Sequence, residues 1–305
     1  MNTNYRDLKF RYKAMIRTFL LLILTINSSI IYASEIDNDS LNVKPTVYLI
    51  GSIHNMHFDS SKNYSINDLL EQIRILKPDV VCGEITPEAY EQAMEGYFPP
   101  EAAVLAEMAG EMNYRFVPVD WRLDYTTQSI ANKSFPVEVE KQCSAINKNI
   151  HAKLKSFNNA SFYDDLHSPD ILNDLDSIYE KIIRVAPLAE IASGSWQERN
   201  RRIVENGIAN AKKAQTIVFV FGIDHIPQLK RQLQTLGIEA QIPKRMFTPG
   251  NNHKMTNAVL ERWKQNHKNL IAIRDKKIES TYDNYQKVIN SKRIENIKEA
   301  LEKSQ

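Results

Sequence analysis

Four short apolar runs, each with a polar residue at its end or one position before it, constrain the fold of this chain more than any other feature. They are "TVYLIGSIH" (46–54), "DVVCGEI" (79–85), "YRFVPVDW" (114–121) and "TIVFVFGIDH" (216–225). Near-continuous apolar runs of this length are typical of strands buried on both faces of a parallel sheet. Segments with helical periodicity separate them, so the sequence predicts an α/β fold with a mainly parallel central sheet flanked by helices.

Helical segments are expected after the first two runs. In residues 65–78 the apolar positions keep a helical period, and Ser65 stands where it can cap the first turn. Two further segments, 87–94 and 99–113, each begin with proline, which is favoured in the first turn of a helix. Both are predicted to be helical.

The chain around the fourth run follows the same pattern. A long helix is expected over 193–214, where Ser195 and Glu198 have the spacing of a capping box. A shorter helix, "IPQLKRQLQTL" (226–236), and a final strand, "GIEAQI" (237–242), follow. Strand, helix and strand in succession again favour a parallel sheet.

Two regions fall outside this repeating pattern. Residues 125–194 contain helical pieces separated by polar breaks and are predicted to be a helical insertion or lid within an α/β domain that covers 46–243. The tail, 255–305, is charged and helical, and it is expected to pack against the domain or against a partner helix. Its residues with near-heptad spacing are Ile278, Tyr282, Tyr285 and Ile289.

The N-terminal 33 residues have the pattern of a secretory signal peptide. Five cations and one anion precede "FLLLILTI" (19–26), and small residues follow at Ala33 and Ser34. The apolar run is shorter than the roughly 20 residues of a membrane span. We therefore expect cleavage and export, to a periplasm or to the outside of the cell, with membrane anchoring by an uncleaved segment as the alternative.

Charge and cysteine content exclude several classes of protein. The net charge is +2 for the whole chain and slightly negative beyond residue 33, which does not favour nucleic-acid binding. Cys82 and Cys143 are the only cysteines, so there is neither a disulfide framework nor zinc-finger spacing. Cys82 lies in an apolar run and is expected to be a buried small side chain, and whether the two are bonded stays open.

The polar ends of the four runs predict a site. The tetrapeptide Gly-x-x-His ends two of them, at His54 and His225, although chance predicts roughly 0.2 occurrences from nine glycines and seven histidines. The other two runs end at Glu84 and Asp120. Parallel strands present ligands at their carboxyl ends, so these four side chains are expected at the same edge of the sheet.

Two imidazoles with one or two carboxylates suit a divalent metal, which would lower the pKa of a bound water. Without metal the same groups can act as general base and general acid. Each has an ordinary structural explanation when taken alone, such as a helix cap for Glu84 or Asp120. His57 would chelate together with His54 only if the loop between them turned helically.

Arg199 and Asn200 are further candidates. An arginine in the first turns of a helix opposes the helix dipole, and residues in locally unfavourable places often serve function. Its guanidinium can hold a carboxylate of the site or an oxyanion of a substrate. The alternative is a solvated, charged helix face.

The chain resembles the TraB/TIKI-like superfamily, which includes the TraB and GumN proteins and is distantly related to erythromycin esterases and haem-binding ChaN-like proteins. The resemblance covers residues 46–243. The motifs that carry it are "LIGSIHNMH", "PDVVCGEI", "VPVDWR", "WQERNRRIVENGI" and "VFVFGIDHIPQL". The sequence "SIHN" lacks the acidic residue that the esterase and haem-binding branches place before this histidine, so it does not support macrolide hydrolysis or haem binding.

The resemblance implies an α/β domain with its active centre at the strand ends, and the TIKI branch implies metal-dependent proteolysis with manganese or cobalt. The motif positions in this chain are His54 and His225 for the histidines, Glu84 for the acidic residue, Arg199 and Asn200 for the helix pair, and Asp120 and Arg122 for the polar pair after the third strand.

The sequence thus predicts an exported, metal-dependent hydrolase that cleaves a peptide or ester bond. His54, Glu84 and His225 would bind the metal or activate water, and Arg199 would stabilise developing negative charge. One alternative is a non-catalytic ligand-binding or signalling protein that uses the same pocket. Another is a protein whose tail, 255–305, serves assembly.

Overall fold

The computed structural model describes residues 44–278 and 291–305. The predicted signal peptide lies outside the described residues, as do Tyr282, Tyr285 and Ile289 of the tail. No helix in the described ranges is long and apolar enough to cross a membrane.

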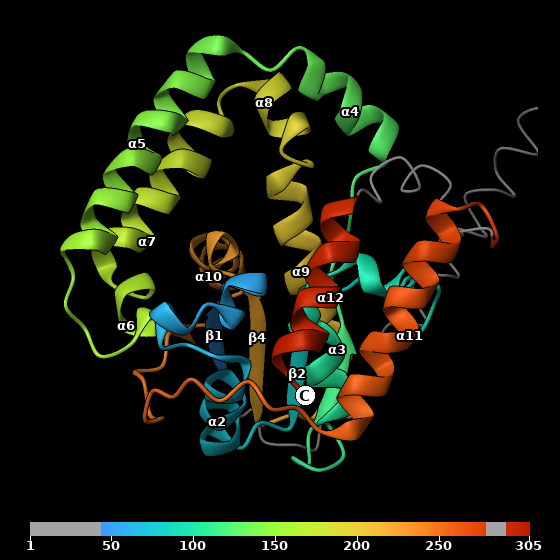
Figure 1. Cartoon of the computed structure of the whole chain (residues 1–305). Helices are drawn as coiled ribbons and strands as arrows, with labels where there is room; N and C mark the ends of the chain where they lie inside the picture. The colour runs from blue at the N-terminus through green and yellow to red at the C-terminus, as the bar shows by residue number, and fades with distance from the viewer. Residues whose placement is uncertain (1–43, 279–290) are drawn as a thin grey trace, which may run out of the picture. The chain divides into compact units, whose positions relative to one another are not determined.

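Five parallel strands form a single sheet in the order β3-β2-β4-β1-β5 (Figure 1). The strands are β1 (Thr46–Ser52), β2 (Val80–Gly83), β3 (Arg115–Pro118), β4 (Thr216–Gly222) and β5 (Ala240–Gln241). The two longest, β1 and β4, pair over their whole length, with Thr46 opposite Thr216 and Ser52 opposite Gly222. All carboxyl ends therefore lie at one edge of the sheet, which confirms the predicted α/β fold.

Side chains alternate between the two faces of the sheet, and each face carries its own helices. On one face Ile50, Val81 and Val220 belong to a core cluster with residues of α2 (Ile66–Leu76) and α3 (Pro100–Glu107). On the other face, residues such as Leu49, Cys82 and Phe219 belong to a second cluster with α9 (Trp196–Asn210) and α10 (Ile226–Thr235). Cys82 is fully buried, as predicted, and both cysteines are free.

The predicted helical insertion is present. Its elements are α4 (Tyr125–Lys133), α5 (Val137–Ser156), α6 (Phe162–Leu166), α7 (Pro169–Asp176), a π-helix (Ser177–Ile183) and α8 (Pro187–Ala192). α4 contacts α8, and α5 contacts both α7 and the π-helix. Ile150, Ile171 and Ile178 belong to a small core of their own (Figure 1, green to yellow).

The tail forms two helices, α11 (Asn257–Arg274) and α12 (Ser291–Lys303), which contact each other. Their apolar residues, including Trp263 and Ile297, belong to the same core cluster as α2 and α3. This tail therefore packs against its own domain.

Two local predictions are wrong. Residues 87–94, predicted to be helical, form successive turns, because Glu91 adopts a left-handed conformation that no helix continues through. The capping box at Ser195 is also absent: Ser195 has φ +52° and its side chain caps nothing, while Glu198 instead pairs with Arg201 and Arg202. By contrast, Ser65 forms the predicted cap of α2, in a capping box.

Candidate active site at the carboxyl ends of the strands

The four predicted strand-end residues lie together. His54 begins a 3-10 turn after β1, and His225 ends a 3-10 turn after β4. Glu84 directly follows β2, and its carboxylate lies between the two imidazoles: His54 Nε2 is 3.8 Å from Oε2, and His225 Nε2 is 3.9 Å from Oε1. Asp120, two residues beyond β3, joins the cluster through ion pairs with Arg122 and Arg199.

Each imidazole is held by its other nitrogen. His54 Nδ1 lies 2.7 Å from Oε1 of Glu101, and His225 Nδ1 lies 2.7 Å from Oδ1 of Asn200. Asn200 in turn donates through Nδ2 to the Trp196 carbonyl, which leaves Oδ1 to accept from the imidazole. Both rings therefore donate through Nδ1 and direct Nε2 towards Glu84.

Glu101 is a member of the site that sequence reasoning missed. It lies in the first turn of α3, only 2% exposed, and Ser52 Oγ donates to the oxygen that also accepts from His54. Within the described residues, its other oxygen has no hydrogen-bond partner. An acidic residue in a first helical turn is ordinarily explained by the helix dipole, so the sequence carried no separate signal for it.

Two arginines bind the two carboxylates. Arg199 donates to Asp120 through Nε (2.8 Å) and through a terminal nitrogen (3.0 Å), and the latter also reaches Glu84 Oε1 at 3.0 Å. Arg122 donates to Asp120 at 2.8 Å and lies 3.4 Å from Glu84. The second oxygen of Glu84 accepts from the Gly222 backbone N–H at 2.8 Å. These two carboxylates thus explain why an arginine occupies the start of α9.

The surroundings give the two histidines opposite pKa shifts. Burial alone would lower the pKa of His54, but the carboxylates of Glu101 and Glu84 raise it to about 9. Burial and the guanidinium of Arg199 instead lower the pKa of His225 well below its usual value. Burial opposes ionisation of Glu84, yet the positive charges of His54 and Arg199 hold its pKa well below the usual range.

Two side chains of the cluster are partly exposed to solvent. The His54 side chain is 40% exposed and that of Arg122 is 26% exposed, whereas Glu84, Asp120 and His225 are each below 8%. A substrate would therefore meet His54 and Arg122 first. His54 also has φ +51°, an uncommon conformation for a residue with a side chain and one that is concentrated at functional sites.

The two strand-end glycines leave space for side chains of the opposite loop. A Cβ at Gly222 would lie 2.7 Å from His54 Nε2, and a Cβ at Gly51 would lie 2.3 Å from Ile223 Cδ1. His167, from the insertion, also approaches Gly51 and accepts its backbone N–H at 2.8 Å. Each loop is thus shaped by its contact with the other.

His57 does not join the site, although its loop does turn helically. The ring is fully buried, Nδ1 donates to the Tyr64 carbonyl at 2.7 Å, and Nε2 lies 3.0 Å from Ser52 Oγ. Because Ser52 is only 1% exposed, this Ser–His pair is inaccessible to a substrate and serves the structure of the loop.

An aromatic stack connects the insertion to the site. Tyr179 of the π-helix stacks on Trp196 with ring centroids 4.1 Å apart, and Trp196 stacks on His225 at 4.2 Å. Tyr179 also donates its hydroxyl to Asp224 at 3.1 Å. The second imidazole is therefore fixed by stacking as well as by Asn200.

The cluster contains side chains of the kinds that can bind a divalent metal. Imidazole nitrogens whose Nδ1–H groups donate to a carboxylate or an amide oxygen are typical of metal-binding histidines, and Glu84 supplies an oxygen ligand. Across residues 44–278 and 291–305, no three His, Cys, Asp or Glu side chains are already close enough together to hold an ion.

Comparison of the chain with protein-family models, curated proteins and solved structures found no match.

Proposed function

We propose that this chain is an exported hydrolase of peptide or ester bonds that uses a divalent metal, manganese or cobalt, held by His54, Glu84 and His225. The observation that supports the proposal is the pair of imidazoles whose Nε2 atoms both face Glu84. Binding and acid–base chemistry both require such fixed nitrogens. The bound metal would supply a water of lowered pKa.

The surrounding residues divide into positioning and contact roles. Asn200 and Glu101 orient the imidazoles, and Arg199 and Asp120 hold Glu84 in place. Arg199 is buried and already shared between two carboxylates. The more exposed Arg122 is therefore the better candidate to bind a substrate carbonyl and stabilise the negative charge that develops on it.

Metal content tests the proposal. The chain from Ser34 onwards, which contains every described residue, is incubated with manganese, cobalt or zinc, desalted and analysed for metal. We expect near-stoichiometric metal in the parent and its loss from the His54→Ala and His225→Ala variants with unchanged circular dichroism. His151→Ala, an exposed histidine on α5, is the matched control and should keep its metal.

Turnover separates a hydrolase from a metal-binding protein without activity. The metal-loaded chain is incubated with a mixture of fluorogenic peptides and with a nitrophenyl ester. Hydrolysis that disappears in His54→Ala and persists in His151→Ala supports the proposal. Metal without hydrolysis of either substrate class would contradict the catalytic part.

The geometry also favours a second candidate, a non-catalytic ligand-binding or signalling protein. Both oxygens of Glu84 already accept hydrogen bonds, from Arg199 and from the Gly222 N–H, so this carboxylate is satisfied without a metal. In that case the parent would take up none of the three ions while keeping its fold. That result would end the metallohydrolase proposal.

Export is part of the proposal and has its own test. It is supported by the basic, apolar and small-residue succession that ends at Ala33. N-terminal sequencing of the protein recovered from the periplasm or medium should give Ser34 as the first residue. An intact N-terminus in the membrane fraction would favour anchoring instead.

A further inference from the structure

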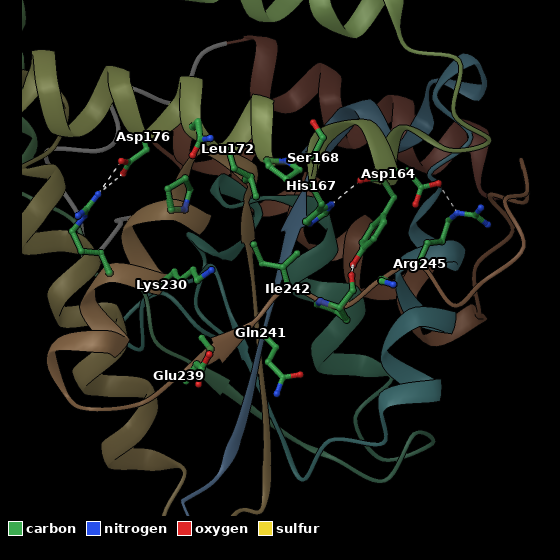
Figure 2. Close-up of a pocket in the computed structure, with 18 of the residues that line it drawn as sticks. Asp164, His167, Ser168, Leu172, Asp176, Lys230, Glu239, Gln241, Ile242 and Arg245 are labelled. Atoms are coloured by element: carbon green, nitrogen blue, oxygen red, sulfur yellow. Dashed lines mark hydrogen bonds and ion pairs between the residues drawn. The ribbon is translucent and has the colours of Figure 1, made fainter.

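A separate groove runs along β5, at the edge of the sheet away from β3. Its volume is about 1160 Å³, and its walls come from α6, α7, α10 and the chain that follows β5 (Figure 2). None of the residues assigned above to metal or substrate lines it. The insertion thus borders two different parts of the molecule, the candidate active site and this groove.

One side of β5 faces no other strand of the described sheet. Ala240 pairs with Val47 and Gln241 pairs with Tyr48, both on β1, and β5 ends the strand order. The edge of a sheet presents backbone N–H and C=O groups that can pair with another extended chain. Residues 239–242 line the groove, contain no helix and precede Pro243, which has no N–H, so this edge offers about four residues, or roughly 13 Å of extended chain.

Two of the cations that line the groove are neutralised by the insertion. Arg231 of α10 donates to both oxygens of Asp176 at 2.8 Å, and Arg245 donates to Asp164 at 2.7 Å. Figure 2 shows these pairs on opposite sides of the groove. They connect α10 and the chain after β5 to α7 and α6 and leave the groove open between them.

The remaining charges give the groove a positive balance. Lys230 and Lys244 line it, are exposed, and form no ion pair with the described residues. Glu239, near the start of β5, is the one lining carboxylate without an ion pair there. Leu172 and Ile242 add partly buried apolar surface between the charges (Figure 2).

We propose that this groove binds an extended acidic peptide segment of another protein, which pairs with β5 as an added strand. Main-chain hydrogen bonds to the strand edge would supply affinity, and alternate side chains would select the sequence. Apolar side chains would contact Leu172 and Ile242, while carboxylates would approach Lys230 and Lys244. This proposal is independent of the metal site, so either can fail alone.

The first test measures charge dependence by fluorescence anisotropy. The probe is a labelled, end-blocked octapeptide of alternating valine and glutamate, added to the chain from Ser34 onwards. The double variant Lys230→Glu/Lys244→Glu should bind at least about 10-fold more weakly, which corresponds to about 1.4 kcal/mol. Lys212→Glu/Lys268→Glu, which makes the same charge change outside the groove, should bind as the parent does.

Glu239→Lys tests the same groove in the opposite direction. It removes the unpaired carboxylate and should tighten binding of the acidic octapeptide. In a second comparison, an alternating valine–lysine octapeptide should bind the parent more weakly than the acidic octapeptide does. Equal affinities for the two octapeptides, or an unchanged affinity in the Lys230→Glu/Lys244→Glu variant, would overturn the assignment of an acidic ligand.

The second test measures strand pairing. Two forms of the acidic octapeptide carry N-methyl groups on odd or on even residues, which removes the backbone donors from one edge of the peptide or from the other. One form should lose binding and the other should keep it, and His54→Ala should change neither result. If both forms bind alike, or if the unmodified peptide does not bind, the proposed strand addition is wrong.

Discussion

The two Gly-x-x-His loops place their imidazoles at nearly the same distance from Glu84 but in opposite environments. His54 is 40% exposed and donates to a carboxylate, whereas His225 is 5% exposed and donates to an amide. The first ring is stabilised as a cation and the second is kept neutral. The motif thus determines where an imidazole lies, and its neighbours determine the proton that it carries.

The difference suggests that His54 and His225 act differently within the site. A neutral, buried imidazole fixed by Asn200 and by the Trp196 ring is a rigid donor to a metal. The exposed imidazole of His54, stabilised as a cation by two carboxylates, has to release a proton before its Nε2 can bind a metal.

Asn200→Leu should have the largest effect. It removes the partner of the His225 Nδ1–H in a fully buried position and leaves that donor unpaired, at a cost of about 1–3 kcal/mol. Urea unfolding measures the loss of stability, and metal analysis should show weaker retention. An unchanged unfolding midpoint would mean that His225 does not depend on this amide.

Glu101→Gln applies the corresponding change to the first loop. His54 keeps a hydrogen-bond acceptor but loses the adjacent charge, so we expect metal affinity to fall about 10–100-fold with a smaller change in stability. Glu107→Gln, on the same helix and paired with Arg262, is the matched control for a lost carboxylate. Equal metal affinities in the two variants would remove Glu101 from the site.

Acid should weaken the first loop before the second. The Gly51 N–H is held by His167, whose pKa is lowered to about 4 by burial, whereas the Gly222 N–H is held by Glu84, which stays ionised to lower pH. The unfolded chain takes up the His167 proton at a higher pH, near 6.5. This contribution to stability is therefore complete above pH 6.5 and is lost as the pH falls towards 4.

The measurement is urea unfolding of the parent and of His167→Gln between pH 7 and pH 4.5. The parent should lose up to about 1.4 kcal/mol per pH unit more than the variant over that interval, because one histidine no longer titrates in the variant. Parallel curves for the two proteins would show that His167 is not held neutral in the folded state.

The smallest effect is expected at the start of the helix that carries Asn200. Ser195 makes no cap bond, so Ser195→Ala should change stability by no more than about 0.5 kcal/mol. Ser65→Ala removes the capping-box hydroxyl from α2, the helix after the first loop, and should cost about 1 kcal/mol. Thermal unfolding of both variants compares the two helix starts directly.

The sequence predicted the framework of the site because that framework follows from strand ends. Apolar runs that end at His54, Glu84, Asp120 and His225 must bring those residues to one edge once the strands are parallel. Periodicity identified α2, and the succession of helical segments and polar breaks indicated α9, α10 and the helical insertion. These are features that neighbouring residues determine locally.

The rest depends on contacts that no local pattern records. Glu101 belongs to the site only because α3 packs beside the loop after β1. Tyr179 reaches Trp196 only because the insertion folds back onto α9. Residues 87–94 have helical composition, yet a left-handed Glu91 turns the chain under the constraint of its surroundings. Tertiary packing decides such cases over intrinsic propensity.

Gly51 and Gly222 each leave room for a side chain of the opposite loop, and this mutual packing affects how the chain folds. Each loop is completed by a side chain of the other, and the whole insertion separates β1 from β4 in sequence. Closing so long a loop lowers the conformational entropy of the chain before native contacts can compensate for it. We therefore expect these strands to pair late in folding. A nascent chain that has not yet emerged to residue 225 has neither loop in its final shape. The site therefore cannot be complete before most of the domain has been synthesised.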